Sequence, residues 1–285
     1  MTASDYIQLT KPRLSMLVWM TTLAGYFMAP GEFAALPLAA TLLGTIFVVG
    51  GANALNQVYE RDIDALMRRT RGRPLPSGRL TAAPAAIFAV TLAGLGVLVL
   101  GLGVNWLSAA LGAAGFGLYV FAYTPLKQRS TLCTLVGAVP GAIPPLIGWA
   151  AATGTLEYTA WLLFGILFLW QMPHFLAIAR LYREDYRRGG MVMLGIEDAD
   201  GPRTYRQMIV YSAALVPVSM ALTQTGVVGG VYFAGAALLS LGFVVVSALA
   251  LRHDERASDR TAFLYSLGYL PALLALMLFD KTLLQ

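Results

Sequence analysis

The chain has 285 residues, of which 58% are hydrophobic and only 12% are charged, whereas a soluble domain typically carries about 25% charged residues. This shortage of charge excludes a water-soluble surface, and the mean hydropathy of +0.67 agrees. The net charge of +5 does not indicate nucleic acid binding, because the charges gather between apolar segments. A single cysteine, Cys133, excludes an intrachain disulfide.

Nine apolar segments are each long enough to approach the roughly 20 residues that a spanning helix needs. In chain order they cover residues 14–30, 34–59, 82–103, 105–123, 132–153, 158–180, 205–225, 228–251 and 262–279. The first follows a polar stretch and precedes further spans, so we expect it to be a retained helix rather than a cleaved signal. The sequence therefore predicts an all-α polytopic membrane protein with nine transmembrane helices, forming one domain over residues 1–285.

Charge sorts the connections between these segments into two kinds. The connections 31–33, 103–105, 154–157 and 225–228 are short and nearly uncharged, whereas 60–81, 124–131, 181–204 and 252–261 are longer or basic. The basic side holds 19 of the 20 Lys and Arg residues, with Lys281 on the other side. Lys and Arg concentrate in cytoplasmic loops. We therefore expect a bacterial or archaeal cell membrane location, with the N-terminus cytoplasmic and the C-terminus outside.

The second segment ends in a row of oxygen-bearing side chains. Asn56, Glu60 and Asp64 are spaced by four residues, which places them on one face of a helix. Mg²⁺ prefers such carboxylates and shares its remaining ligand positions with substrate phosphates. A solvated helix end, with its acids paired to neighbouring arginines, explains the spacing about equally well.

An arginine-rich loop follows, from Arg68 to Arg79. Guanidinium groups bind phosphate oxygens in a bidentate manner. Alone, the loop is more simply a cytoplasmic segment that contacts lipid head groups. Next to an acidic patch it becomes a candidate clamp for a diphosphate.

Two further cytoplasmic connections carry polar side chains. Tyr123, Lys127 and Arg129 lie in one, and Arg183 and Asp185 lie in the next. His174 comes before that connection, roughly 9 Å below the charged face at 1.5 Å per residue. A structural histidine beside the Pro173 kink is an alternative explanation. His253 lies in a charged loop.

Together these residues resemble the UbiA superfamily of intramembrane prenyltransferases over almost the whole chain. The resemblance rests on Asn56, Glu60 and Asp64, on the stretch from Arg69 to Leu75, and on Tyr123 with Lys127. It implies a helical bundle around a central cavity, a prenyl diphosphate donor and Mg²⁺. Glu60 stands where the wider superfamily has Asp.

Within the superfamily, the chain is most similar to the branch that prenylates haem. The string Pro173-His174-Phe175, the stretch from Tyr182 to Tyr186, and Gly141 to Trp149 carry this likeness. The second acidic motif of other branches is reduced here to Asp185. The resemblance implies farnesyl diphosphate as donor, haem B as acceptor, and haem A synthase or terminal oxidase assembly proteins as partners.

The same resemblance implies a role for each site residue. Mg²⁺ would be held by Asn56, Glu60, Asp64 and Asp185. The diphosphate would be bound by Arg69, Arg73, Tyr123, Lys127, Arg129 and Arg183. Haem would contact His174 and Trp170, with His174 as an iron ligand, a propionate partner or a proton acceptor.

Three other functions are compatible with parts of the pattern. A prenyltransferase for an aromatic quinone precursor should keep the second acid pair, which this chain lacks. A transporter usually places ionisable residues at mid-membrane depth, and no Asp, Glu, Lys or Arg lies in the middle of a segment. A structural assembly factor for a terminal oxidase needs no aligned Asn56, Glu60 and Asp64.

Overall fold

The computed structural model describes residues 2–31, 33–198, 201–251 and 255–284, with the side chain of residue 255 left out. All the regular secondary structure of this part of the chain is helical. Eight of its helical stretches are long and apolar enough to cross a membrane, which confirms a multi-pass membrane protein. They are α3 (Ala35–Tyr59), α5 (Ala82–Gly103), α6 with η1 and α7 (Trp106–Leu126), α8 (Cys133–Thr153), α9 (Tyr158–Leu181), α12 with η2 (Pro202–Thr225), α13 (Gly230–Ala250) and α14 (Glu255–Leu284).

The first predicted span corresponds to α2 (Pro12–Met28), which has 17 residues and is shorter than these eight. It nevertheless joins the same two ends of the bundle as α3. At one end Lys11 Nζ lies 3.1 Å from Asn56 Oδ1, and at the other Lys281 Nζ donates to the carbonyls of Phe27 and Ala29. The only Lys or Arg predicted on the uncharged side therefore caps the C-terminus of α2.

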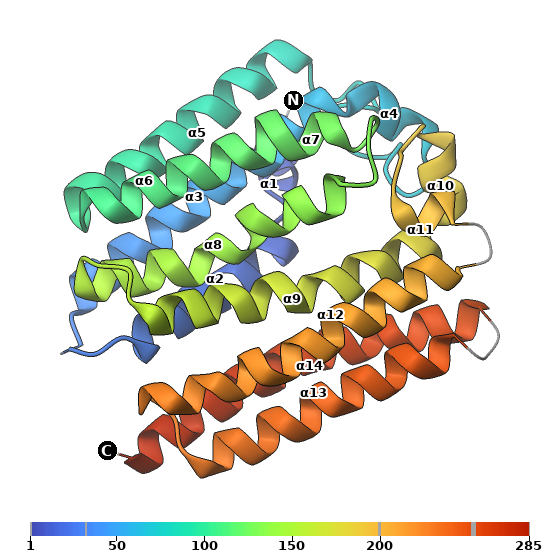
Figure 1. Cartoon of the computed structure of the whole chain (residues 1–285). Coiled ribbons are helices and arrows are strands. Elements are labelled where there is room, and N and C mark those ends of the chain that lie inside the picture. Colours follow the sequence, from blue (N-terminus) through green and yellow to red (C-terminus); the bar gives the residue numbers. More distant parts are fainter. Residues whose placement is uncertain (1, 32, 199–200, 252–254, 285) are drawn as a thin grey trace.

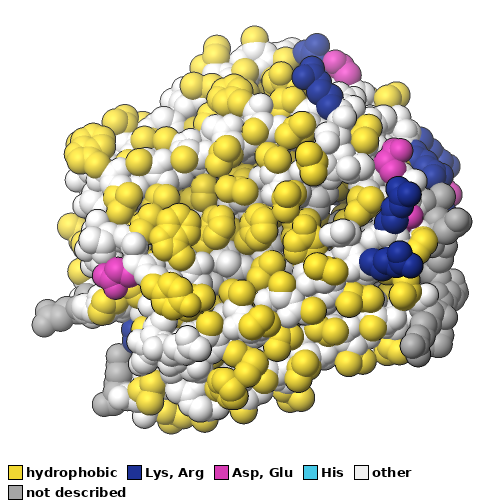
Figure 2. Space-filling view, in the orientation of Figure 1, with side chains coloured by type: hydrophobic (Ala, Val, Ile, Leu, Met, Phe, Trp, Pro, Cys, Tyr) yellow, Lys and Arg dark blue, Asp and Glu magenta, His cyan; other side chains and the backbone are white. Residues whose placement is uncertain are grey.

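The two ends of the bundle differ in character (Figure 1). The turns that join α5 to α6, α8 to α9 and α12 to α13 lie at one end, together with the C-terminus. The other end holds the short helices α4 (Arg61–Leu66), α10 (Arg183–Arg188) and α11 (Leu194–Glu197), beside α7 (Thr124–Leu126). On the face that Figure 2 shows, hydrophobic side chains cover the middle and most charged ones gather towards this second end. We call it the basic end.

Helix α14 begins earlier than the sequence predicts. The expected connection 252–261 is helical from residue 255 onwards, although residues 252–254, including His253, lie outside the described residues. The polar first turns of α14 are held by a buried ion pair, because Arg180 Nε lies 3.2 Å from Asp259 Oδ1. Tyr205 donates a 3.0 Å hydrogen bond to the same carboxylate. Apolar periodicity alone does not reveal a helical turn held by such a pair.

Helices α2 and α8 approach each other closely through glycines. A Cβ atom on Gly148 would collide with the backbone carbonyl of Thr22, and one on Gly25 would collide with Pro145. Small residues allow helix backbones to pack closely in membranes. This contact fixes α2 against α8 and closes one wall of the cavity described below.

A π-helical segment, η1 (Leu118–Tyr123), interrupts the path from α6 (Trp106–Gly117) to α7. Such segments are rare and frequently occur at functional sites, because they shift the direction of the side chains that follow. Here Tyr119 and Tyr123 both face the cavity. Thr124 donates a 2.9 Å hydrogen bond back to the Tyr119 carbonyl.

Candidate active site

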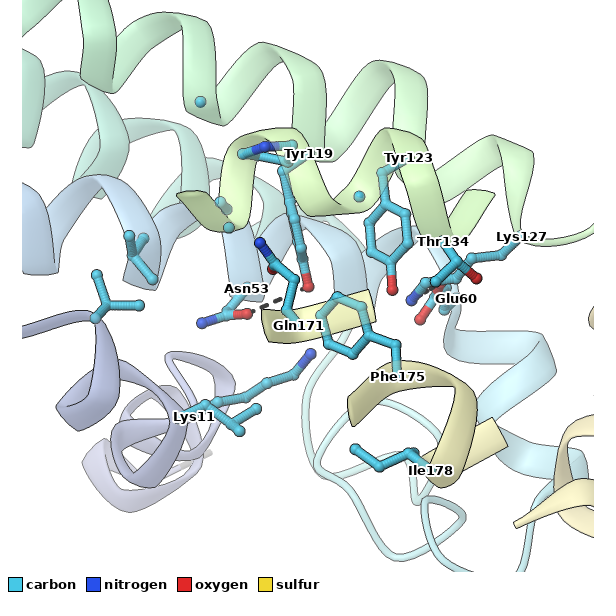
Figure 3. Close-up of a pocket in the computed structure, with 18 of the residues that line it drawn as sticks. Lys11, Asn53, Glu60, Tyr119, Tyr123, Lys127, Thr134, Gln171, Phe175 and Ile178 are labelled. Atoms are coloured by element: carbon cyan, nitrogen blue, oxygen red, sulfur yellow. Dashed lines mark hydrogen bonds and ion pairs between the residues drawn. The ribbon is translucent and has the colours of Figure 1, made fainter. Parts of the chain in front are cut away.

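One cavity of about 530 Å³ lies near the basic end of the bundle. Its walls come from α2, α3, α6, η1, α8 and α9, with Phe263 of α14. Most of its depth is apolar, and its polar residues come together from helices that are far apart in sequence (Figure 3). The predicted site residues among its lining are Glu60, Asp64, Arg69, Arg73, Tyr123, Lys127 and His174.

The three residues predicted from the α3 spacing are all buried, and each contacts one cation. Lys11 Nζ lies 3.1 Å from Asn56 Oδ1. Lys127 Nζ lies 2.8 Å from Glu60 Oε1. Arg73 Nη1 lies 2.6 Å from Asp64 Oδ2.

Asn56, Glu60 and Asp64 are 0%, 4% and 1% exposed, so these residues do not form a solvated helix end. Asn56 is further oriented by its amide, which donates a 3.1 Å hydrogen bond to Thr124 Oγ1. The alternative explanation also predicted that the acids pair with basic side chains. These pairs are present, but they are buried.

Burial and charge act in opposite directions on the Glu60–Lys127 pair. Burial alone would raise the pKa of Glu60, but the Lys127 ammonium, with smaller contributions from Lys11 and Asn56, outweighs burial and lowers the pKa from its ordinary value. Burial alone would lower the pKa of Lys127, and the Glu60 carboxylate instead raises it well above its ordinary value. Both groups are therefore charged at neutral pH.

Lys11 differs from Lys127 and Arg73 because it contacts an uncharged amide, that of Asn56, instead of a carboxylate. Burial, together with the nearby charges of Arg73 and Lys127, lowers the pKa of Lys11 to about 7. Its backbone has φ 51°, the left-handed conformation, and it is the only non-glycine residue with positive φ in the described part of the chain. Such strain is retained where surrounding structure enforces it, often at functional sites.

The oxygen atoms of Asn56, Glu60 and Asp64 suit a divalent cation whose other ligands come from a bound substrate. Asp64 Oδ1 is buried and has no hydrogen-bond partner among the described residues. A buried carboxylate oxygen without a partner is a hard ligand of the kind that Mg²⁺ binds. No group of three His, Cys, Asp or Glu side chains that could hold a metal occurs in the described ranges. The remaining ligands would therefore have to come from phosphate and water.

Tyr123 and Lys127 are neighbours in the cavity wall, as their spacing predicts. The Lys127 ammonium lies 4.6 Å from the centre of the Tyr123 ring. Tyr119 stands beside Tyr123, with ring centres 5.2 Å apart, and its hydroxyl lies 3.5 Å from Asn53 Oδ1. In Figure 3 the Tyr123 hydroxyl points towards the side on which Glu60 and Lys127 meet.

Asp185 holds the arginine loop instead of lining the cavity. Its two carboxylate oxygens accept 3.2 Å hydrogen bonds from the backbone N–H groups of Arg68 and Arg69. The Arg69 guanidinium then lies over the rings of Tyr182 and Tyr186, at 5.3 and 5.8 Å. Asp185 thus lies outside the cavity lining with each of its oxygens bonded to the backbone, and its role as a fourth metal ligand stays a prediction.

His174 lines the cavity from α9, and Trp170 lies behind it. The two rings are stacked with centres 5.1 Å apart, and Phe263 stacks at 5.3 Å. Trp170 donates a 2.8 Å hydrogen bond to the Ser266 carbonyl and does not line the cavity. The structure thus makes Trp170 a support for His174, whereas the sequence grouped both as haem contacts.

Two predicted diphosphate ligands lie elsewhere. Arg129 is exposed, and neither Arg129 nor Arg183 is part of the cavity lining. Conversely, sequence reasoning did not select Lys11, Asn53, Tyr119 or Gln171, all of which line the cavity. Asn53 lies one turn before Asn56 on the same face, which was a usable signal. Nothing in the local sequence marks Lys11, because its position depends on the junction between α1 (Ala3–Leu9) and α2.

Comparison with known proteins places this geometry in context. The model of the UbiA prenyltransferase family matches residues 18–269. The chain is 45% identical to a protoheme IX farnesyltransferase of Solibacter usitatus, over 97% of this chain and 98% of that protein. It is also 45% identical to a protoheme IX farnesyltransferase of Myxococcus xanthus, over 98% and 95% of the two chains.

Solved structures share the fold at low sequence identity. A digeranylgeranylglyceryl phosphate synthase superposes with a TM-score of 0.82 at 16% identity, covering 98% of both chains. A UbiA homolog from Archaeoglobus fulgidus bound to DMAPP and Mg²⁺ superposes with a TM-score of 0.70 at 12% identity, covering 96% of this chain and 99% of that one.

Proposed function

The chain belongs to the UbiA prenyltransferase family, and on that premise we propose that it transfers a farnesyl group from farnesyl diphosphate to a vinyl group of haem B. The product is haem O, and diphosphate is released. The observation that carries the proposal is that a single cavity joins buried cations and carboxylates at its polar end to His174 and an apolar wall. The 45% identity to two protoheme IX farnesyltransferases over nearly the full length of the chain supports the choice of donor and acceptor.

Ionisation of the donor requires neutralising the leaving diphosphate. We assign this to Arg69, Arg73 and Lys127, whose charged groups line the polar end of the cavity, with Tyr123 offering a hydroxyl. Positioned charges of this kind stabilise developing negative charge most where water is excluded. When bound to Asn56, Glu60 and Asp64, Mg²⁺ would supply further positive charge to the diphosphate oxygens. Arg129 and Arg183 are left out of this assignment because they do not line the cavity. Asn56 does not line the cavity either, but it is kept because its Oδ1 contacts the lining residue Lys11.

The apolar part of the cavity suits the farnesyl chain and the porphyrin. Its lining includes Val48, Phe116, Ile147, Phe175 and Ile178. Breaking the allylic C–O bond leaves a farnesyl cation, which the vinyl group attacks through its terminal carbon to form the new C–C bond. Water then adds to the cation next to the ring and loses a proton, which completes a hydroxyethylfarnesyl side chain. Apolar walls protect the farnesyl cation from water before the vinyl group reacts.

His174 is the residue that we assign to the acceptor. It is the one histidine among the described residues of the cavity lining, and its ring is held in place by Trp170, Phe263 and Ser266. Neutral imidazole is a common iron ligand and also accepts protons. The ring is placed to face the plane or the edge of a porphyrin in the cavity.

For the location, we propose a cell membrane with the basic end in the cytoplasm, the N-terminus cytoplasmic and the C-terminus outside. The support is the preference of Lys and Arg for cytoplasmic loops, together with their concentration near α4, α10 and α11. The active site would then open on the side where soluble prenyl diphosphates are available.

The direct test is to incubate the purified protein with haem B, farnesyl diphosphate and Mg²⁺ and to analyse the pigment by mass spectrometry. We expect the mass of haem O and stoichiometric release of diphosphate. Diphosphate release with an aromatic acceptor, and none with haem B, would instead assign the protein to another branch of the family. Absence of diphosphate release with every acceptor would refute the enzymatic function.

A further inference from the structure

The contacts of Asn56, Glu60 and Asp64 have a one-to-one pattern. Each of these predicted metal ligands is in contact with a single basic side chain: Lys11 with Asn56, Lys127 with Glu60, and Arg73 with Asp64. The three cations come from three separate parts of the chain, before α2, after α7 and after α4. They converge on ligands that lie along one stretch of α3 and α4.

The positive charge exceeds the negative charge in this group. Two carboxylates face three basic side chains, which leaves one excess positive charge when Lys11 is protonated. A divalent cation entering alone would add two more charges to a buried region, where like charges repel strongly because little water screens them. A phosphate monoester carries about −1.5 to −2 charges, and a diphosphate ester is more negative. It would therefore offset the excess charge of the basic side chains together with the charge of the divalent cation.

We propose that Lys11, Lys127 and Arg73 act as resident counter-cations of the metal ligands, and that metal and diphosphate each bind the ligand-free cavity more tightly when the other is present. As the pair enters, the three basic groups transfer from Asn56, Glu60 and Asp64 to phosphate oxygens. The two carboxylates and the amide oxygen then become available to the metal. This rests on the proposed function, since it takes the site to bind a prenyl diphosphate with a divalent cation.

Lys11 is the decisive member of the three. Lys127 and Arg73 each neutralise a carboxylate, so their charges are already balanced. Lys11 contacts an uncharged amide and is held there by a left-handed backbone at the start of α2. When protonated, it therefore supplies the excess charge that weakens the binding of a lone metal ion and attracts the anion.

The test uses the full-length protein in detergent, with Mn²⁺ and inorganic diphosphate as probes. Equilibrium dialysis at equal free Mn²⁺ measures the bound metal with and without diphosphate. We expect diphosphate to tighten Mn²⁺ binding to the unsubstituted protein by about tenfold or more, since one adjacent unit charge is worth at least that factor. Lys11→Met should bind Mn²⁺ alone about tenfold more tightly, and diphosphate alone about tenfold more weakly.

Two variants serve as controls. Arg13→Met removes an exposed cation two residues away and should behave as the unsubstituted protein does. Lys11→Arg keeps the charge and should retain the dependence of Mn²⁺ binding on diphosphate, which excludes a purely structural role for the lysine. Because Lys11→Arg also tests the role of charge, the proposal stays testable even if Lys11→Met melts at a lower temperature.

Equal Mn²⁺ affinity with and without diphosphate in the unsubstituted protein would overturn the proposal, as would an unchanged Mn²⁺ affinity in folded Lys11→Met. Failure of the proposed function looks different. If haem O does not form but Mn²⁺ and diphosphate still bind together, only the acceptor assignment is wrong. If haem O forms while Mn²⁺ binds equally well alone, only the counter-cation proposal is wrong.

Discussion

The Nδ1 atom of His174 lies 2.7 Å from Ser266 Oγ, and the surroundings of Ser266 decide which of the two donates. The Ser266 hydroxyl donates its single proton to the Phe263 carbonyl, 2.6 Å away. The serine oxygen must therefore accept from His174, which places the imidazole proton on Nδ1. Nε2 is left with a lone pair, the form that ligates iron or accepts a proton.

Removing this serine should weaken haem binding without unfolding the protein. In Ser266→Ala the Nδ1 proton loses its acceptor, so ring orientation and tautomer are no longer fixed. Loss of such a supporting hydrogen bond typically costs 10- to 100-fold in metal affinity, and we expect about tenfold weaker haem B binding in an absorbance titration. Ser212→Ala is the control, because that hydroxyl bonds only to carbonyls of its own helix. An unchanged titration in both Ser266→Ala and His174→Ala would remove His174 from the acceptor site.

The Asp185 carboxylate should control the order of the arginine loop. In Asp185→Ala the N–H groups of Arg68 and Arg69 lose charge-assisted hydrogen bonds, which are worth about 1.5–3 kcal/mol when the partner is charged. We expect faster tryptic cleavage after Arg68, Arg69 and Arg71, and a higher KM for farnesyl diphosphate, with a smaller change in kcat.

The neighbouring acid provides the matched control for Asp185. The Glu184 side chain is 85% exposed, and its partner among the described residues is Arg188 at 3.9 Å, so Glu184→Ala should be cleaved at the unsubstituted rate. A metal-ligand role for Asp185 predicts another result. In that case kcat would collapse, Mn²⁺ binding would be lost, and the loop would remain as resistant to trypsin as before.

The sequence predicts the bundle well because lipid imposes a simple length and polarity rule on each span. The segment 82–103 coincides with α5, and 34–59 with α3 to within one residue. The spacing of Asn56 in α3 and Glu60 at the C-terminal cap of that helix is likewise predictable, since the Glu60 N–H still bonds to the Asn56 carbonyl and keeps the helical period.

Contacts between distant segments are what the sequence does not reveal. Asp185 is an acid in an acidic motif, and only the fold shows that its oxygens face the backbone after α4. In the sequence Lys11 is one of many basic residues near a membrane surface. In the structure its own left-handed backbone conformation directs its side chain into the cavity. Both depend on turn geometry, which neither apolar periodicity nor charge patterning encodes.

The close contact of α2 with α8 should be sensitive to one methyl group. In Gly148→Ala the added Cβ meets the backbone carbonyl of Thr22, which cannot rotate away as a side chain can. We expect a lower melting temperature in detergent, with a cost of about 1–3 kcal/mol, as for other overpacked sites. Gly94→Ala is the control, since nothing lies within 4 Å of its Cβ position, and this helical site should gain slightly in stability. Equal melting temperatures would show that the helices can separate freely.

Asp64 and Asp62 lie on the same short helix, α4, in opposite environments. The Asp64 side chain is 1% exposed and pairs with Arg73, whereas the Asp62 side chain is 87% exposed. Asp64→Asn keeps the size of the side chain but removes a charge from the polar end of the cavity. Losing one positioned electrostatic group commonly lowers kcat by about 10²- to 10³-fold, and we expect a loss of at least this size in a diphosphate-release assay.

Folding should survive the Asp64→Asn substitution better than activity does. Arg73 is left without its carboxylate, but its side chain is 24% exposed, so water can solvate the freed charge and soften the cost that a fully buried pair would show. Asp62→Asn should retain the activity of the unsubstituted protein, because in the described part of the chain its carboxylate pairs with the exposed Arg61. If Asp64→Asn turned over normally, or if Asp62→Asn were equally impaired, the site would not depend on the buried face of α4.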